Sequence, residues 1–185
     1  MKNKIYFITL FLLLIFALNS KGTYAQEKAS VSSAKIIIAE IEPVNDYRVK
    51  ILEDYFKEMN SPLAPYAKDF VENADKYNLD WKLVAAISGV ESTYGQAIPV
   101  NSYNAWGWGV YGDNVIRFGS WKEGIGTISQ GLRERYMNQW GGKDIYQIGA
   151  MYASSPAWAS HVERTMNQIQ DFAMRNPKDT LSLSL

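Results

Sequence analysis

Apolar residues from position 46 onward recur at steps of three and four, and this spacing limits the fold more than any other feature of the chain. The pattern runs over 46–59 and returns over 61–77 and 80–92. A period of 3.6 residues puts such side chains on one face of a helix, whereas a half-buried strand needs a period of two. The sequence therefore predicts successive amphipathic helices packed around one core.

Residues that favour helix ends stand at the predicted boundaries. Ser61 precedes Pro62, and proline suits the first turn because its missing N–H would be unpaired there anyway. Asp80 is placed to cap the next helix, and Gly95 to end it. These signals predict that new helices begin near residues 61 and 80.

Three later helices follow the same logic. Ser120 and Glu123 form a capping box for a helix that the glycine pair at 141–142 ends. A short helix is expected around 145–152, and Pro156 precedes the last helix. The residues of that last helix expected to face inward are Trp158, Val162, Ile169 and Phe172.

The period changes to about two between Trp106 and Phe118, with Gly112-Asp113-Asn114 in the middle. Such a run is typical of a small β-hairpin. The expected fold class is therefore mainly α: one helical domain over 46–175 with one small β-hairpin lobe.

The two ends of the chain differ from this pattern. Residues 1–25 have lysines near the start, then an apolar run too short for a typical transmembrane helix, and small residues at the end. This composition predicts a secretory signal peptide cleaved after Ala25, with an uncleaved membrane anchor as the alternative. Residues 26–45 are expected to form a linker or arm, and 176–185 a flexible tail. The protein is thus expected to be exported, periplasmic or extracellular at the cell wall.

Composition excludes several classes of function. Of the 19 basic residues, three lie in 1–25, so 16 remain against 19 acidic ones and the formal charge becomes −3. Nucleic-acid binding needs a basic face, which this balance does not supply. The chain has no cysteine and a single histidine, His161, whose polar neighbours indicate a solvated helix face. We expect a monomer with no metal and no cofactor.

Aromatic residues make up 14% of the chain and gather between 94 and 158. Buried aromatics are ordinarily core residues, but beside polar loops they also suit the apolar faces of sugar rings. Trp106 and Trp108 alternate within the predicted strand, which would turn both toward one side as stacking residues. Core packing and sugar binding both remain open for this cluster.

Glu91 is the best candidate for acid chemistry. Cleavage of a glycosidic bond needs a carboxylic acid that is still protonated near neutral pH. Glu91 lies seven residues after Val84 and four after Ile87, so it falls on the apolar stripe near the end of its helix. Burial and the negative end of the helix dipole both raise the pKa of such a carboxyl. The alternative is a partly exposed residue at a helix end.

Four blocks of sequence resemble a known family. Residues 83–95, LVAAISGVESTYG, resemble the catalytic-glutamate motif of the glucosaminidase family of bacterial autolysins and flagellar muramidase domains, and that of the related soluble lytic transglycosylases. Residues 104–107, Asn-Ala-Trp-Gly, resemble the glucosaminidase motif at the floor of the groove. Residues 118–123 and 152–158 resemble later blocks, so the likeness extends over about 62–172.

The resemblance implies a lysozyme-like helical domain in which Glu91 is the general acid and Tyr152 lies near the cleaved bond. It implies a peptidoglycan hydrolase that cleaves β-1,4 glycosidic bonds of the cell-wall glycan, specifically an endo-β-N-acetylglucosaminidase. The chain departs from the pattern at Tyr94, where the family often has tryptophan. The glycine- and glutamine-bearing stretch that usually follows the glutamate in the transglycosylases does not align with this chain. The residues expected to contact the glycan are Ser92, Tyr94, Asn104, Trp106, Trp108, Tyr111 and Trp158.

A second catalytic carboxylate would stand roughly 5 to 9.5 Å from the acid. Asp113, at the tip of the predicted hairpin, is the candidate, although aspartate also suits a tight turn. Without such a partner, the N-acetyl carbonyl or the C6 hydroxyl of the substrate could act as the internal nucleophile. Tyr152 would then stabilise the transition state or orient the acetamido group.

Three rival functions remain open at this point. A lytic transglycosylase of the same fold would release anhydro-muramyl products. A non-catalytic glycan-binding module would bind wall material without releasing sugar. A purely structural helical protein would do neither.

Overall fold

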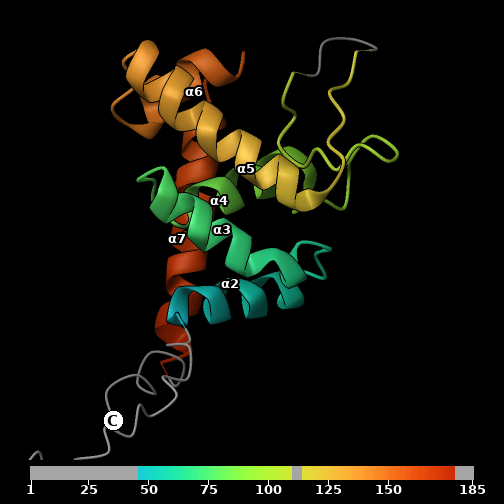
Figure 1. The fold of residues 1–185 in the computed structure, drawn as a ribbon. Helices are drawn as coiled ribbons and strands as arrows, with labels where there is room; N and C mark the ends of the chain where they lie inside the picture. The colour runs from blue at the N-terminus through green and yellow to red at the C-terminus, as the bar shows by residue number, and fades with distance from the viewer. Residues whose placement is uncertain (1–45, 110–113, 178–185) are drawn as a thin grey trace, which may run out of the picture. The chain divides into compact units, whose positions relative to one another are not determined.

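The structure is a computed structural model that describes residues 46–109 and 114–177. Those residues are mainly helical, as the apolar spacing predicts. In chain order the elements are α2 (Tyr47–Glu58), the 3-10 turn η1 (Ala64–Tyr66), α3 (Ala67–Lys76), α4 (Leu83–Ser92), α5 (Trp121–Gly131), the π-helix η2 (Leu132–Gln139), α6 (Ile145–Tyr152) and α7 (Trp158–Arg175) (Figure 1).

The long helix α7 is the element against which α2, α4 and α6 pack (Figure 1). Its predicted inward residues Trp158, Val162, Ile169 and Phe172 are all buried. Removing these side chains from water stabilises the fold by roughly 1.5–3 kcal/mol each. Helix α3 packs against both α5 and α2.

Helix α4 lies inside the packed helices. All six residues from Leu83 to Ser88 are buried, which is expected for a helix that is apolar around most of its surface. Only its last turn approaches the surface, where Glu91 is half-buried. The packing of α4 against α7 therefore fixes the position of this carboxyl group.

The helix predicted over 61–77 is broken in the structure. Ser61 does act as a cap, because its hydroxyl accepts the Leu63 N–H at 3.0 Å while donating to the Tyr94 carbonyl at 2.7 Å. The chain then makes the turn η1, in which Pro65 contributes no N–H, and α3 begins at Ala67. The cap predicted at Ser61 is confirmed, but Pro65 delays the start of the α-helix to Ala67.

The predicted β-hairpin is not shown. Within the described flanks, 106–109 and 114–118, only Asn114 makes an isolated bridge and neither side forms a strand. Gly107 and Gly109 both have φ of +61°, which no extended strand allows, so the alternation of tryptophan and glycine belongs to tight turns. Residues 110–113, the tip of the predicted hairpin, lie outside the described residues.

The capping box before α5 is present in a shifted form. Ser120 Oγ accepts the Glu123 N–H at 3.2 Å, and Glu123 Oε2 accepts the N–H of Gly119 at 2.7 Å. Beyond α5 the chain widens into the π-helix η2, which the apolar spacing did not predict. It ends just before Gly141, whose φ is +78°.

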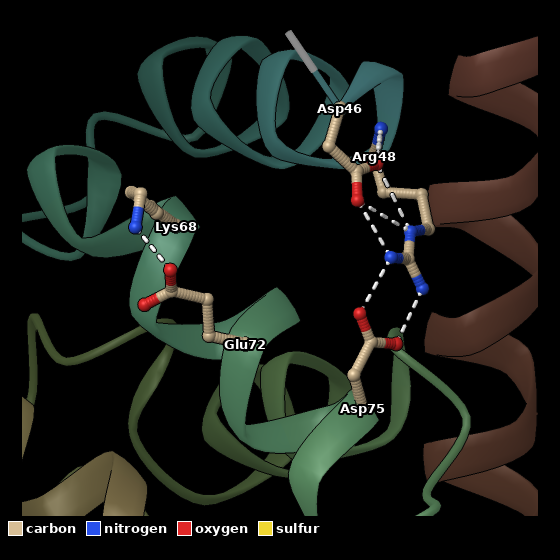
Figure 2. A network of polar contacts seen from close by, with 5 residues as sticks. All are labelled: Asp46, Arg48, Lys68, Glu72 and Asp75. Atoms are coloured by element: carbon tan, nitrogen blue, oxygen red, sulfur yellow. Dashed lines mark hydrogen bonds and ion pairs between the residues drawn. The ribbon is translucent and has the colours of Figure 1, made fainter. Parts of the chain in front are cut away.

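A charged cluster ties α2 to α3. The guanidinium of Arg48 lies between Asp46 and Asp75, and its Nη1 and Nη2 donate to both carboxylate oxygens of Asp75 at 2.7 Å (Figure 2). These hydrogen bonds hold the pKa of both aspartates below the ordinary value. On α3, Lys68 pairs with Glu72 one turn later (Figure 2).

The predicted signal peptide (1–25), the arm (26–45) and nearly all of the tail (176–185) lie outside the described residues. Within 46–109 and 114–177, no helix has the length and apolar character needed to cross a bilayer.

Candidate active site

Glu91 occupies the last turn of α4, and its side chain is half-buried. Burial raises the pKa of its carboxyl above the ordinary value, and a hydrogen bond from Trp158 lowers the pKa by a smaller amount. The net direction is upward, as the position on the apolar stripe predicted. Such a carboxyl holds its proton to a higher pH than an exposed glutamate does.

The indole of Trp158 contacts the Glu91 carboxyl directly. Trp158 is the first residue of α7 and is buried, and its Nε1–H donates to Glu91 Oε1 at 2.6 Å. An indole N–H can only donate, so Oε1 is the accepting oxygen whatever the charge of the carboxyl. The carbonyl oxygen is the better acceptor of a neutral carboxyl, which favours the proton of neutral Glu91 on Oε2.

Gly107 leaves space beside that second oxygen. A Cβ at position 107 would lie 3.0 Å from Glu91 Oε2, closer than side chains ordinarily approach, and the φ of +61° also favours glycine. The backbone at Gly107 therefore lies close to Glu91 Oε2, and a larger residue at this position would crowd that oxygen.

Tyr152, the last residue of α6, lies against Trp158. Their rings stack with centroids 4.7 Å apart and planes 21° apart, and the Tyr152 hydroxyl donates to the Trp106 carbonyl at 2.7 Å. Burial, the charge of Glu91 and the neighbouring Tyr136 raise the pKa of Tyr152 well above its ordinary value. Tyr152 therefore remains a neutral phenol near Glu91.

Further aromatic rings surround this pair. Trp108 lies with its ring centroid 6.0 Å from that of Tyr152 and 5.8 Å from that of Tyr136. Trp108 also covers Gly131, where a Cβ would meet the indole at 2.6 Å. The structure thus brings four predicted residues, Glu91, Tyr152, Trp158 and Trp108, into one neighbourhood.

Asn104 organises the loop that carries Trp108. Its Nδ2 donates to the carbonyls of Trp108 and Ile116, and its Oδ1 accepts the N–H of Trp108 at 3.1 Å and that of Trp106 at 3.4 Å. With 2% of its surface exposed, Asn104 holds the loop and does not face a ligand. One side-chain amide thus links Trp108 and Ile116, which lie on the two described sides of this loop.

Three predicted glycan contacts instead have packing roles. Trp106 is fully buried and donates from Nε1 to the Val84 carbonyl at 2.9 Å, so it cannot stack on a sugar. Tyr94 is buried and its hydroxyl lies 2.7 Å from that of Tyr55. Ser92 is buried and donates to the Ala105 carbonyl at 2.8 Å, which ties the end of α4 to the loop.

The chain directly after Glu91 has an uncommon backbone. Thr93, Tyr94 and Gly95 all have φ between +52° and +83°. A β-branched residue in this region is strained, and such strain often accompanies functional sites. Here the three residues turn the chain away from α4, and Tyr94 enters the core.

The remaining candidates lie elsewhere or beyond the described residues. Asp113 and Tyr111 fall within 110–113 and are outside the description. Glu123 serves the capping box, and His161 is exposed, as its neighbours indicated. Among the described residues, no group of three or more acidic or histidine side chains is arranged to hold a metal ion.

Sequence reasoning missed two residues near this site, Tyr136 and Trp140. Their ring centroids lie 4.9 Å apart, and Tyr136 lies 5.5 Å from Tyr152. Neither was predicted as a site residue. Their spacing of four residues was the available signal, because it places two rings on one helix face.

Comparison with known proteins adds no relative. No protein-family model matches the sequence, and no curated protein matches it significantly.

Proposed function

We propose that this protein is a peptidoglycan hydrolase that cleaves β-1,4 glycosidic bonds, with Glu91 as its general acid. The observation that carries the proposal is the pairing of Glu91 with Trp158: a half-buried carboxyl of raised pKa, oriented by one donor and bordered by aromatic rings. Carbohydrate chemistry uses this combination of a protonated acid and flat apolar surfaces. The resemblance of residues 83–95 and 152–158 to the glucosaminidase family supports the endo-β-N-acetylglucosaminidase activity in particular.

The proposed reaction begins with transfer of the proton on Glu91 Oε2 to the glycosidic oxygen. The bond between that oxygen and the anomeric carbon breaks, the leaving sugar keeps the proton, and Glu91 becomes a carboxylate. The hydrogen bond from Trp158 strengthens as negative charge develops on its acceptor. An interaction that is stronger in the transition state than in the resting enzyme accelerates the step.

The second half of the reaction needs a nucleophile at the anomeric carbon. Asp113 or the acetamido carbonyl of the substrate fills this role in hydrolysis, and water then completes it. The Tyr152 hydroxyl donates a hydrogen bond to the Trp106 carbonyl, so its oxygen still offers lone pairs to a substrate. We propose that it accepts the acetamido N–H and so orients that group.

Peptidoglycan as substrate and export as destination rest on the sequence. The predicted signal peptide in residues 1–25 would deliver the enzyme to the periplasm or the cell surface, where this glycan lies. Lysozyme-like architecture is likewise proposed from the resemblance, and the helical fold is compatible with it.

The experiment compares wild type with Glu91→Gln on purified peptidoglycan. Loss of turbidity reports cleavage, and mass spectrometry identifies the new ends. We expect the substitution to lower the rate about 10²- to 10⁴-fold, because glutamine keeps the shape but cannot donate the proton. Glu123→Gln is the matched control, since Glu123 only accepts a backbone N–H beside α5.

Each outcome has a definite meaning. Water-added reducing ends at N-acetylglucosamine support the proposal, whereas anhydro-muramyl ends would identify a lytic transglycosylase. Binding to wall material without any release of sugar would identify a binding module. Equal rates for wild type and Glu91→Gln would remove Glu91 from the mechanism.

A further inference from the structure

A row of four aromatic rings leads away from Glu91. In spatial order the rings belong to Trp158, Tyr152, Tyr136 and Trp140, and successive centroids lie 4.7, 5.5 and 4.9 Å apart. Their exposure increases along the row: Trp158 is 4% exposed, Tyr152 and Tyr136 are half-buried, and Trp140 is 48% exposed. The row thus connects the proposed acid to the surface without a break.

The outer half of the row stands on the π-helix. Tyr136 lies within η2, and Trp140 directly follows it as the residue that ends the helix. A π-helical stretch of eight residues is rare, and short π-helical turns are often found at functional sites. Here it places two aromatic side chains, four residues apart, at the outer end of the row that Trp158 begins.

Core packing does not account for Trp140. An indole that is half exposed contributes little to the burial of apolar surface, so packing alone does not explain why Trp140 extends the row. Its surroundings are polar: the guanidinium of Arg135 lies 5.9 Å from the Trp140 ring, and Asn138 and Gln139 are exposed. A flat ring beside hydrogen-bond donors and acceptors suits a ligand with alternating apolar faces and polar edges.

We propose that Tyr136 and Trp140 form an additional sugar-binding site for a β-linked amino-sugar strand, on one side of the bond next to Glu91. This inference rests on the proposed function, because continuity of the row with Glu91 identifies the occupant as the glycan. Trp140 stacks on a sugar distant from the reacting one, and Tyr136 bridges it to Tyr152. The affinity of the protein for a glycan therefore increases with the number of sugars until Trp140 is covered.

The test measures binding, so that it does not depend on turnover. In the Glu91→Gln background, calorimetric titration is performed with β-1,4-linked N-acetylglucosamine oligomers from the disaccharide to the hexasaccharide. We expect Trp140→Ala to weaken binding of the hexasaccharide about tenfold and to leave that of the disaccharide unchanged. Trp140→Phe, which keeps a ring, should retain most of the affinity.

Tyr47→Ala is the matched control, because Tyr47 is a 38% exposed aromatic on the distant helix α2. It should bind every oligomer like its parent, and thermal unfolding should show all variants folded. Equal affinities of the parent and Trp140→Ala for the hexasaccharide would overturn the inference, as would no measurable binding of the hexasaccharide. A dependence on Trp140 in a protein whose wild type releases no sugar would sustain the binding site and reject only the hydrolase.

Discussion

Glu91 experiences two opposite influences on its pKa. Burial favours the neutral acid, while the indole N–H of Trp158 favours the carboxylate by donating to Oε1. The balance raises the pKa of the carboxyl, while the indole N–H still supports the carboxylate once the proton is given away. Trp158 is thus a positioning residue that acts through Glu91.

Replacing Trp158 by phenylalanine separates these influences. The ring that stacks on Tyr152 remains, but the N–H is lost, so the pKa of Glu91 should rise further. Because the protonated acid is the active form, the alkaline limb of the kcat/KM profile against pH should move to higher pH. The maximal rate should fall about ten- to hundredfold, as expected for a lost hydrogen bond to a charged group. A lower rate with an unmoved alkaline limb would mean that Trp158 serves packing alone.

Asn104 offers a second test at a single side chain. Its side-chain amide is almost fully buried and makes hydrogen bonds to backbone groups of Trp106, Trp108 and Ile116. Asn104→Ala leaves these backbone groups without their partner and should lower the free energy of unfolding by about 2–3 kcal/mol. Urea unfolding measures the loss, with the exposed Asn138→Ala as a control that should change little.

The sequence was a good guide to Glu91 and a poor one to its aromatic neighbours. The spacing of apolar residues predicts which face of a helix is buried, so the partly buried position of Glu91 followed from the residues before it. The same spacing does not predict which residue of another helix an aromatic ring contacts. Trp106 therefore looked like a sugar platform and is core, whereas the bond from Trp158 and the contacts of Tyr136 depend on residues distant in sequence.

Helices were predicted better than the loop between them. The apolar stripes located α2, α4, α5, α6 and α7, and Ser120 caps α5 as predicted. The predicted ends of α4 were wrong, because this helix begins after Lys82 and ends at Ser92, and neither Asp80 nor Gly95 is its cap. The hairpin predicted from Trp106 to Phe118 is not shown, since alternation alone cannot distinguish a strand from turns built on glycines of positive φ. The π-helix was missed because a π-helix has no distinct apolar period in so short a stretch.

Helix α5 packs closely against the loop that carries Trp106, and glycine at position 124 permits this contact. A Cβ at Gly124 would lie 2.7 Å from the Trp106 ring and 3.0 Å from the Tyr103 carbonyl. Gly124→Ala should therefore destabilise the protein by about 2 kcal/mol through overpacking. Gly126 is the control on the same helix, because its Cβ would meet only Asn73 Oδ1 at 3.6 Å. Gly126→Ala should be neutral or stabilise by up to about 1 kcal/mol. Equal unfolding midpoints for the two variants would contradict this packing.

The chain has no cysteine, so packing, hydrogen bonds and ion pairs stabilise the described residues without a disulfide. The core formed by α2, α3, α4, α5 and α7 must therefore also offset the cost of keeping an ionisable group partly buried at Glu91. Proteins commonly lose some stability where a functional group is held in such an environment. The stability of the whole fold should thus depend on the charge of this one residue.

Glu91→Gln should unfold at a higher temperature than wild type at pH 7 to 8. The pKa of Glu91 is higher in the folded protein than its ordinary value of 4.5, so the folded state binds the proton more tightly than the unfolded chain. Wild-type stability must then fall as the pH rises from about 4.5 through the folded pKa, whereas glutamine does not titrate. The difference in Tm between the two proteins should be largest above the folded pKa of Glu91 and vanish below pH 4.5. Other carboxylates titrate in both proteins, so their effect on Tm cancels in this difference. Thermal unfolding from pH 4 to 8 provides the measurement, and a wild type more stable than Glu91→Gln at pH 8 would contradict a raised pKa at this site.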